Sequence, residues 1–272
     1  MIDATAPGTR RARILKRIQR EGRVSLAELA SEHAVSAVTV HRDLQLLSEE
    51  GLLERVRGGA RSLPGPAARI ETSWNARLRE AAPEKDAIAA AARELIEDGS
   101  TIFIDASSTG LALAHAIELR PPADLTLVTT SPAIALGLSA ASIHVIVAPG
   151  EVDQHMRVVT GRWTTEFLAR LTFDTAFVSA AGITLDHGLT TSRSGLADTL
   201  NTAADSAERV VGLMDSTKFE RSSLLTIRDA TALDLIITDD RLDPAVAAAF
   251  RAAGVTLQVV SGVAEASDAE AD

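Results

Sequence analysis

Residues 36 to 47 read SAVTVHRDLQLL and predict a short helix with an apolar back and a polar front. Val40, Leu44 and Leu47 recur at helical spacing, so they would face a hydrophobic core. The polar side chains are then directed away from that core, where a partner outside the fold can meet them. These side chains are Thr39, His41, Arg42 and Gln45.

The sequence on either side of this helix completes a supersecondary pattern. Before it, RRARILKRIQR (10–20) and the stretch after Ser25 predict two amphipathic helices, and Ser25 with Glu28 forms a capping-box pattern at the second. Ser36 can cap the third helix. After it, LLERVRGGARSL (52–63) predicts two short strands joined by a Gly-Gly turn. We therefore expect a winged helix-turn-helix.

The polar front of the third helix matches the chemistry of DNA bases. Arginine suits guanine edges or phosphate, glutamine suits adenine edges, and threonine reaches either. The arginines beside the Gly-Gly turn would add contacts from the wing. The DNA-binding residues that we predict are Ser36, Thr39, His41, Arg42, Gln45, Arg55 and Arg57.

Charge and composition agree with a DNA-binding module on a larger acidic body. The 272-residue chain has a net charge of -10, yet residues 1–66 hold 11 basic and 8 acidic side chains. This asymmetry favours a polyanion as the partner of the N-terminal segment. The chain has no cysteine, which excludes disulfides and thiolate metal sites. It shows no apolar run long enough for a membrane span and no apolar signal core, so we expect a cytoplasmic protein.

The larger part of the chain alternates apolar runs with helical stretches. Such an alternation predicts an α/β domain with a mainly parallel sheet and helices on both faces. We expect residues 1–61 to form the DNA-binding domain, 62–82 a linker rich in Pro and Gly, 83–261 the effector domain and 262–272 a disordered acidic tail. The predicted strands are TIFID, LTLVTT, IHVIVA, FDTAFVSA, RVVGLMD and LDLIITD.

The carboxyl ends of these strands are polar, and the ligand crevice of such folds opens there. Asp105 closes the first strand and is followed by serines and a threonine that open a helix, where hydroxyls and backbone amides can hold a phosphate or sugar hydroxyls. Asp215 and Lys218 close a later strand. Each of these residues is also a common turn or cap residue, so the prediction rests on their gathering at one edge.

The sequence resembles the DeoR family of bacterial regulators from about Arg10 to Asp240. Within the third helix, the resemblance lies in Ser36, Thr39, His41, Arg42, Asp43 and Leu44, with His41 in place of a more usual arginine. In the larger domain it lies in Glu84-Lys85, Asp105 with Ser108 and Thr109, Thr129 with Ser131, Gly150, and DSTKF at 215–219.

The resemblance implies an effector domain related to the ribose-phosphate isomerase fold, with a pocket for a phosphorylated sugar. The implied effector-binding residues are Lys85, Asp105, Ser107, Ser108, Thr109, Thr129, Thr130, Gly150, Gly182, Asp215 and Lys218. The chain departs from the family pattern at Ser107, Thr130, Pro149 and Leu200, and Leu200 stands where a basic residue is expected. Arg162 or Arg193 is a candidate to replace that cation.

These observations predict a transcriptional regulator, a repressor of carbohydrate-metabolism genes controlled by a sugar phosphate. We expect an operator DNA, a small-molecule effector and a homo-oligomer, either a dimer or a tetramer, with no cofactor, metal or membrane partner. A sugar-phosphate isomerase is the alternative, with Asp105 as base and Lys218 as cation, although an isomerase has no need of a DNA-binding module. A DNA-binding architectural protein without a ligand is a further alternative.

Overall fold

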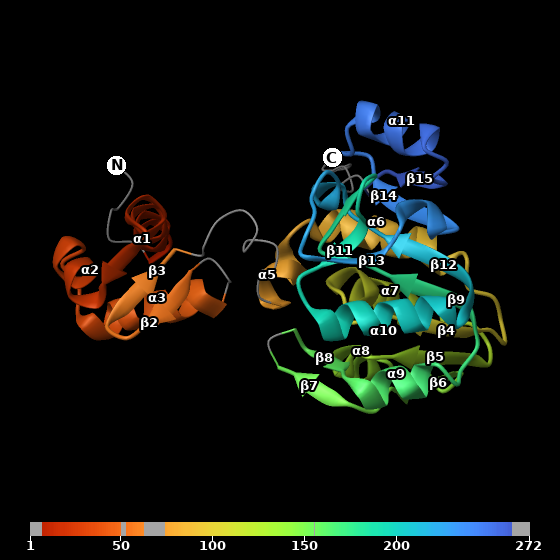
Figure 1. Cartoon of the computed structure of the whole chain (residues 1–272). Coiled ribbons are helices and arrows are strands. Elements are labelled where there is room, and N and C mark those ends of the chain that lie inside the picture. Colours follow the sequence, from red (N-terminus) through yellow and green to blue (C-terminus); the bar gives the residue numbers. More distant parts are fainter. Residues whose placement is uncertain (1–6, 50–52, 63–73, 155, 263–272) are drawn as a thin grey trace, which may run out of the picture. The chain divides into compact units, whose positions relative to one another are not determined.

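The computed structural model describes residues 7–49, 53–62, 74–154 and 156–262. The chain divides into two compact units, Met1–Glu80 and Ala81–Asp272 (Figure 1). Of the segment predicted as a linker, residues 63–73 lie outside the described residues, and Trp74–Arg79 forms the helix α5. The predicted tail also lies outside the described residues from position 263 onward.

The first unit is a winged helix-turn-helix, as predicted. Its three helices pack around a core that includes Ile14, Ile18, Leu29, Val40 and Leu44, all at most 1% exposed. The helices are α1 (Pro7–Glu21), α2 (Leu26–Glu32) and α3 (Ala37–Glu49), and the strands are β1 (Arg23–Ser25), β2 (Glu54–Val56) and β3 (Gly59–Arg61).

The predicted local signals of this unit are present in the structure. The Ser25 hydroxyl accepts the backbone N–H of Glu28, and the Glu28 carboxylate accepts the N–H of Ser25, which forms the capping box of α2. The wing differs from the prediction in one respect, because the returning strand β3 also pairs with β1, giving a three-stranded sheet of order β1-β3-β2. Gly59 allows this close pairing, since a Cβ there would lie 2.2 Å from the carbonyl oxygen of Val24.

The second unit is built on a seven-stranded sheet whose pairs are all parallel, in the order β15-β14-β12-β9-β4-β5-β6. This confirms the predicted parallel sheet, and each of the six predicted apolar runs contributes one strand. The strands are β4 (Thr101–Ile104), β5 (Leu125–Thr129), β6 (Ile143–Val147), β9 (Phe173–Val178), β12 (Ala207–Leu213), β14 (Leu235–Asp239) and β15 (Leu257–Val260).

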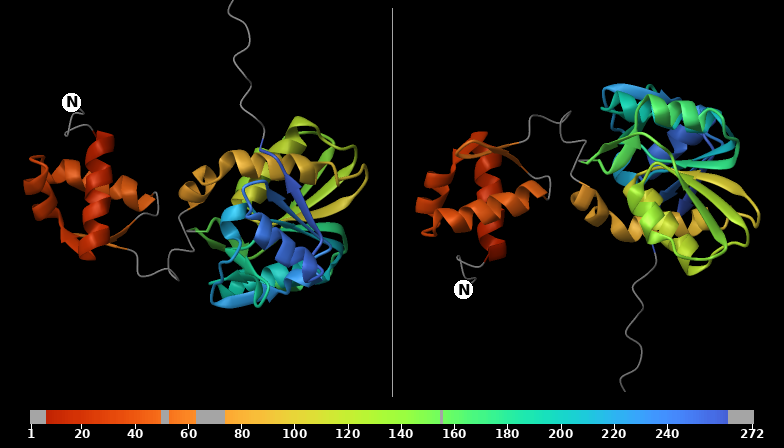
Figure 2. Two further views of the ribbon diagram at one scale, coloured as in Figure 1. Left: turned by 90° about the horizontal axis from the view of Figure 1, so that it is seen from above. Right: turned by 90° about the horizontal axis from the view of Figure 1, so that it is seen from below.

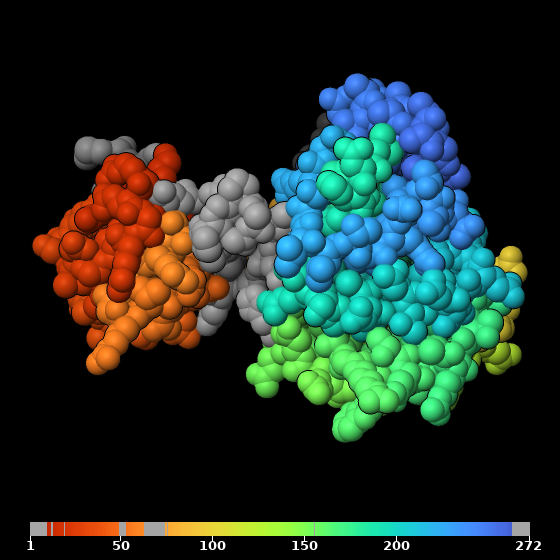
Figure 3. Space-filling model, viewed as in Figure 1, coloured from red at the N-terminus to blue at the C-terminus, as the bar shows by residue number. Residues whose placement is uncertain are grey.

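Helices cover both faces of this sheet, as Figure 2 shows from two directions. One face packs against α6 (Ala82–Arg93), α7 (Ser108–Leu119) and α8 (Pro132–Gly137). The other packs against α9 (Arg162–Leu168), α10 (Ser194–Asp205) and α11 (Pro244–Ala252). In the space-filling view of Figure 3, α10 (cyan) and α9 (green) lie at the surface toward the viewer. Both faces are therefore apolar, which explains the near-continuous apolar runs.

Smaller elements extend the carboxyl side of the sheet and were not predicted. They are an antiparallel pair, β7 (Glu151–Asp153) with β8 (Val158–Thr160), and a three-stranded sheet of β10 (Gly182–Thr184), β11 (Gly188–Thr191) and β13 (Leu225–Arg228). Among the described helices, none combines the length and the apolar character needed to cross a membrane.

Candidate DNA-reading surface and effector site

The outward face of α3 carries a continuous line of exposed side chains. Val38, His41, Arg42 and Gln45 are all exposed, at the spacing i, i+3, i+4 and i+7 that places residues on one side of a helix. We call these four residues the recognition stripe. Three of them were predicted from the sequence, whereas Val38 was missed because a valine carries no polar signal.

Ser36 and Thr39 lie at the start of α3 and interact with each other. The backbone N–H of Thr39 donates to the Ser36 hydroxyl over 3.2 Å, and the two hydroxyl oxygens are 2.9 Å apart. Ser36 therefore caps the helix, as the sequence suggested. Thr39 is only half-exposed, and its hydroxyl is engaged at the cap instead of standing in the recognition stripe.

His41 connects the recognition helix to the wing. A guanidinium nitrogen of Arg55, on β2, lies 2.7 Å from Nε2 of His41. Because a guanidinium can only donate, Nε2 must accept, which assigns the ring proton to Nδ1. Arg57 lies exposed in the turn that follows. His41 thus orients the Arg55 guanidinium.

A buried ion pair holds α3 against α1. The Arg10 guanidinium contacts both carboxylate oxygens of Asp43, at 2.6 and 3.3 Å, and the two side chains are 9% and 6% exposed. This bidentate contact fixes how α3 presents its outer face.

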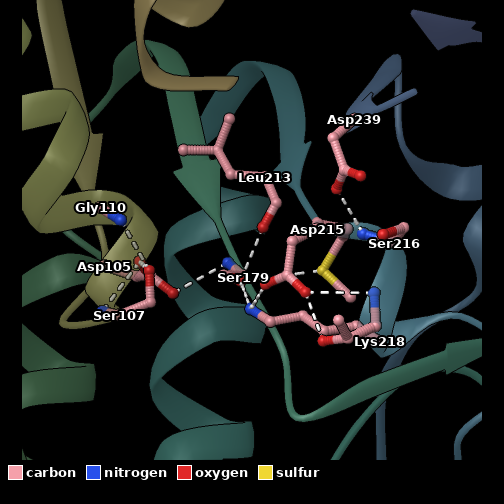
Figure 4. Close-up of polar contacts among 11 residues, drawn as sticks. Asp105, Ser107, Gly110, Ser179, Leu213, Asp215, Ser216, Lys218 and Asp239 are labelled. Carbon is pink, nitrogen blue, oxygen red and sulfur yellow. Dashed lines mark hydrogen bonds and ion pairs between the residues drawn. The ribbon is translucent and has the colours of Figure 1, made fainter. Parts of the chain in front are cut away.

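In the second unit, polar side chains gather where adjacent strands end (Figure 4). Asp105, directly after β4, is 3% exposed and accepts the backbone N–H and hydroxyl of Ser107, at 3.1 and 2.6 Å, and the backbone N–H of Ser179, at 2.8 Å. Burial raises the pKa of Asp105, while these hydrogen bonds and the charge of Lys218 offset part of the rise. Asp105 thereby joins the loops that follow β4 and β9.

Lys218 reaches into this cluster from the short helix after β12. Its ammonium group donates to the Ser179 hydroxyl over 2.6 Å and lies 3.9 Å from the Asp215 carboxylate. The Ser179 hydroxyl donates in turn to the carbonyl oxygen of Leu213. Asp239, at the end of β14, accepts the backbone N–H of Ser216 over 2.7 Å. Residues from four neighbouring strand ends are thus linked in one polar network.

The remaining predicted effector residues divide into three kinds. Thr109 and Thr130 are fully buried, and each hydroxyl lacks a hydrogen-bond partner within the described structure. Gly150 and Gly182 have packing reasons to be glycine, since a Cβ at either would lie within 2.4 Å of a neighbouring atom. The others are buried side chains: Lys85 in α6, Ser108 at the start of α7, and Thr129 at the end of β5, whose hydroxyl donates to the carbonyl oxygen of Ile104.

A pocket of about 240 Å³ lies at the N-terminus of α10, next to this network. Its wall includes Met156, Val158 and Leu196, which pack against Ala106, the neighbour of Asp105. Among the residues that the structure describes, no side chain caps α10, and Ser194 and Gly195 of its first turn line the pocket. The lining residues are Asp153, Met156, Val158, Thr160, Ser192, Arg193, Ser194, Gly195 and Leu196.

The pocket lining contains none of the predicted effector-binding residues. It does contain Arg193, which the sequence suggested as a replacement cation. The SRSG run that opens α10 has the Ser and Gly content of a ligand loop, and this was the signal available in the sequence. Arg193 is 3.4 Å from Asp153, whereas Arg162 is highly exposed and pairs with Glu166 outside the lining. Leu200 is fully buried in the core beneath α10, so packing accounts for an apolar residue there.

Comparisons with known proteins agree for both units. The family model of the DeoR-like helix-turn-helix domain matches residues 10–64, and that of the DeoR C terminal sensor domain matches residues 80–240. The chain is 31% identical to the HTH-type transcriptional regulator GolR of Listeria innocua, over 93% of this chain and 98% of that protein. It is 30% identical to the glycerol-3-phosphate regulon repressor of Escherichia coli, over 83% and 88%.

Among solved structures, a ribose 5-phosphate isomerase from Plasmodium falciparum is similar over 50% of this chain and 52% of its own. Its sequence identity is 16% and its TM-score is 0.37.

Proposed function

The chain belongs to the DeoR family of DNA-binding transcriptional regulators, and we propose that it represses carbohydrate-metabolism genes until a phosphorylated sugar binds its second unit. The observation that carries the effector class is the pocket at the N-terminus of α10. The first backbone amides of α10 and the guanidinium of Arg193 favour an anion, and a phosphate that binds there exchanges with the Asp153 carboxylate, which lies 3.4 Å from Arg193. The regulon repressor of Escherichia coli, named for glycerol 3-phosphate, supports the same class of ligand.

In this proposal, the predicted effector-binding residues lie next to the pocket and contact the part of the effector that extends beyond it. Ser108, Thr109 and Thr130 offer hydroxyls to the sugar, and Lys218 adds positive charge. Ser107 holds Asp105 through the hydroxyl that it donates to this carboxylate. Asp105 holds the loops in place, since three N–H and O–H groups already donate to its two oxygens. Lys85, Thr129, Gly150, Gly182 and Asp215 complete the proposed set.

We propose that the effector is bound and not converted. An isomerase needs a general base with a lone pair directed at a substrate carbon. The candidate base, Asp105, is buried and engaged by its own loops, which argues against that role. The named relatives are regulators as well.

The protein acts on DNA as a homo-oligomer in this proposal, in the cytoplasm where the chromosome lies. A single helix-turn-helix contacts few bases, and symmetric pairs of modules match repeated half-sites. The effector would change how two such modules sit on an operator.

Binding of the purified protein to its own upstream DNA, at fixed salt, tests the proposal. We expect specific binding that one phosphorylated sugar relieves and its unphosphorylated counterpart does not. Arg42→Ala should weaken ligand-free binding about 10- to 100-fold, as loss of a base contact does. Arg193→Ala should leave ligand-free binding unchanged and remove the response. Absence of specific DNA binding refutes the regulator, and a response to neutral sugars alone refutes the phosphate.

A further inference from the structure

Val38 is an exception on the surface of the first unit. Its side chain is 78% exposed, and it is the only large hydrophobic residue so exposed among the described residues of this unit. Three other large apolar side chains of α3, Val40, Leu44 and Leu47, are buried in the core. Because Val38 lies in the recognition stripe, any partner that covers His41, Arg42 and Gln45 would also cover this valine.

The position of Val38 indicates which chemical group would contact it. Val38 stands at one end of the recognition stripe, three residues before His41 and four before Arg42. The hydroxyl of its neighbour Thr39 is taken up by Ser36, so it does not compete for the same space. If Arg42 contacts the edge of one base in the major groove, Val38, one helical turn earlier, lies against the edge of an adjacent base.

Only one base offers an apolar group in the major groove, the C5 methyl of thymine. The γ-methyl groups of valine neither donate nor accept, so a guanine, adenine or cytosine edge pressed against them would lose water without replacement. Valine is also restricted at χ1, which limits the entropy lost when it is held in a contact.

We propose that Val38 reads a thymine methyl group in each operator half-site, beside the base contacted by Arg42. This inference rests on the proposed DNA-binding function and adds a residue that selects sequence. A neutral contact of this kind differs from phosphate attraction, because its strength depends on the base and changes little with salt.

The test uses a site selected by the wild-type protein from a pool of random duplexes. Each thymine of the site is then replaced by deoxyuridine, which removes the methyl group and keeps every hydrogen-bonding atom. Affinities are measured for the wild type, Val38→Ala and Val38→Thr. The matched control is Val259→Ala, an exposed valine on β15 of the other unit.

At one thymine per half-site, deoxyuridine should weaken wild-type binding about fourfold, the effect of losing one buried methyl group. Val38→Ala should bind the thymine and deoxyuridine sites equally, and Val38→Thr, which keeps one methyl group, should fall between. Val259→Ala should behave as wild type. Because Val38 is exposed, thermal unfolding of these variants should match the wild type.

The outcomes separate the inference from the function on which it rests. For each thymine, the ratio of the affinities for the thymine and deoxyuridine sites is compared between the wild type and Val38→Ala. If this ratio is the same for both proteins at every thymine, the role of Val38 is overturned and the proposed regulatory function stands. A change of oligomeric state in Val38→Ala, without methyl discrimination, also overturns the role of Val38 and assigns the valine to a protein contact. A pool that yields no preferred sequence overturns the DNA-binding function together with the inference.

Discussion

Lys218 supplies the positive charge of the polar network in Figure 4. We predict that replacing it by methionine lowers the free energy of unfolding by an amount that depends on pH. Methionine has a similar length, so it fills the space of the lysine stem while removing the ammonium group. The Ser179 hydroxyl still donates to the carbonyl oxygen of Leu213, so that group stays satisfied. What changes is the electrostatic environment of two buried carboxylates, Asp105 and Asp215.

The size of the loss follows from the contacts. A hydrogen bond from a charged donor contributes about 1.5 to 3 kcal/mol, and the Asp215 ion pair at 3.9 Å adds less because of its length. The Lys218 side chain is 16% exposed, so some solvent screening remains. We therefore expect the free energy of unfolding of the second unit to fall by about 2 kcal/mol at neutral pH.

The pH dependence has a definite sign. The pKa of Asp105 is raised in the folded protein, and Lys218 acts to lower it. At a pH between the pKa of Asp105 in the unfolded chain and its raised pKa in the folded chain, the folded chain holds a proton that the unfolded chain has released. The free energy of unfolding therefore falls as pH rises across that range. Removal of Lys218 extends the range upward. The deficit of Lys218→Met should therefore be larger at about pH 8 than at about pH 5, where Asp105 is closer to its protonated form.

Hydrogen exchange of β9 and β12 in urea measures the stability of this unit separately from the first. Lys218→Arg is the matched control, because it keeps the charge, and it should retain most of the stability and its pH profile. An equal deficit at both pH values would show that the lysine acts through its hydrogen bond to Ser179 and its packing, without coupling to the ionisation of Asp105. No deficit at either value would refute the electrostatic reasoning.

Three further substitutions probe other parts of the molecule. Asp43→Ala removes the buried carboxylate that contacts the Arg10 guanidinium and should destabilise the first unit by about 2 to 3 kcal/mol, seen as an early transition in calorimetry; coincidence with the wild type would contradict the role of the pair. Gly110→Ala places a Cβ 2.6 Å from the carbonyl oxygen of Asp105 and should lower the melting temperature by several degrees, while an unchanged value would mean that α7 shifts freely. Leu200→Ala, at a fully buried site, should cost about 2 to 5 kcal/mol in urea unfolding, and a cost below about 1 kcal/mol would refute its place in the core.

Elements that depend on neighbours in the chain could be predicted from the sequence. The capping box at Ser25 and Glu28, the helix opened by Ser36 and the apolar strand runs each contain their own signal within a few residues. The two periodicities, near 3.6 for helices and 2 or continuous for strands, were enough to specify a winged helix-turn-helix and a parallel α/β domain. Polar residues after the strands also indicated which edge of the sheet to inspect.

The identities of contacts across the chain required the folded structure. Nothing near Arg23 announces its strand pairing with Arg61, and nothing near Leu200 tells whether that side chain faces the core or a ligand. The engagement of the Asp105 oxygens depends on Ser179, which is 74 residues away.

The sequence by itself therefore determined the helices and the apolar strands that make up the two folds, the family and the location of the polar edge, because those signals are local or repeat along the chain. Only the tertiary structure decided that Val38 is exposed, that the hydroxyls of Ser36 and Thr39 interact with each other, and which loops line the pocket beside Arg193. The physical reason is that exposure and hydrogen-bond partners are set by packing between segments distant in sequence, and local periodicity carries no record of that packing.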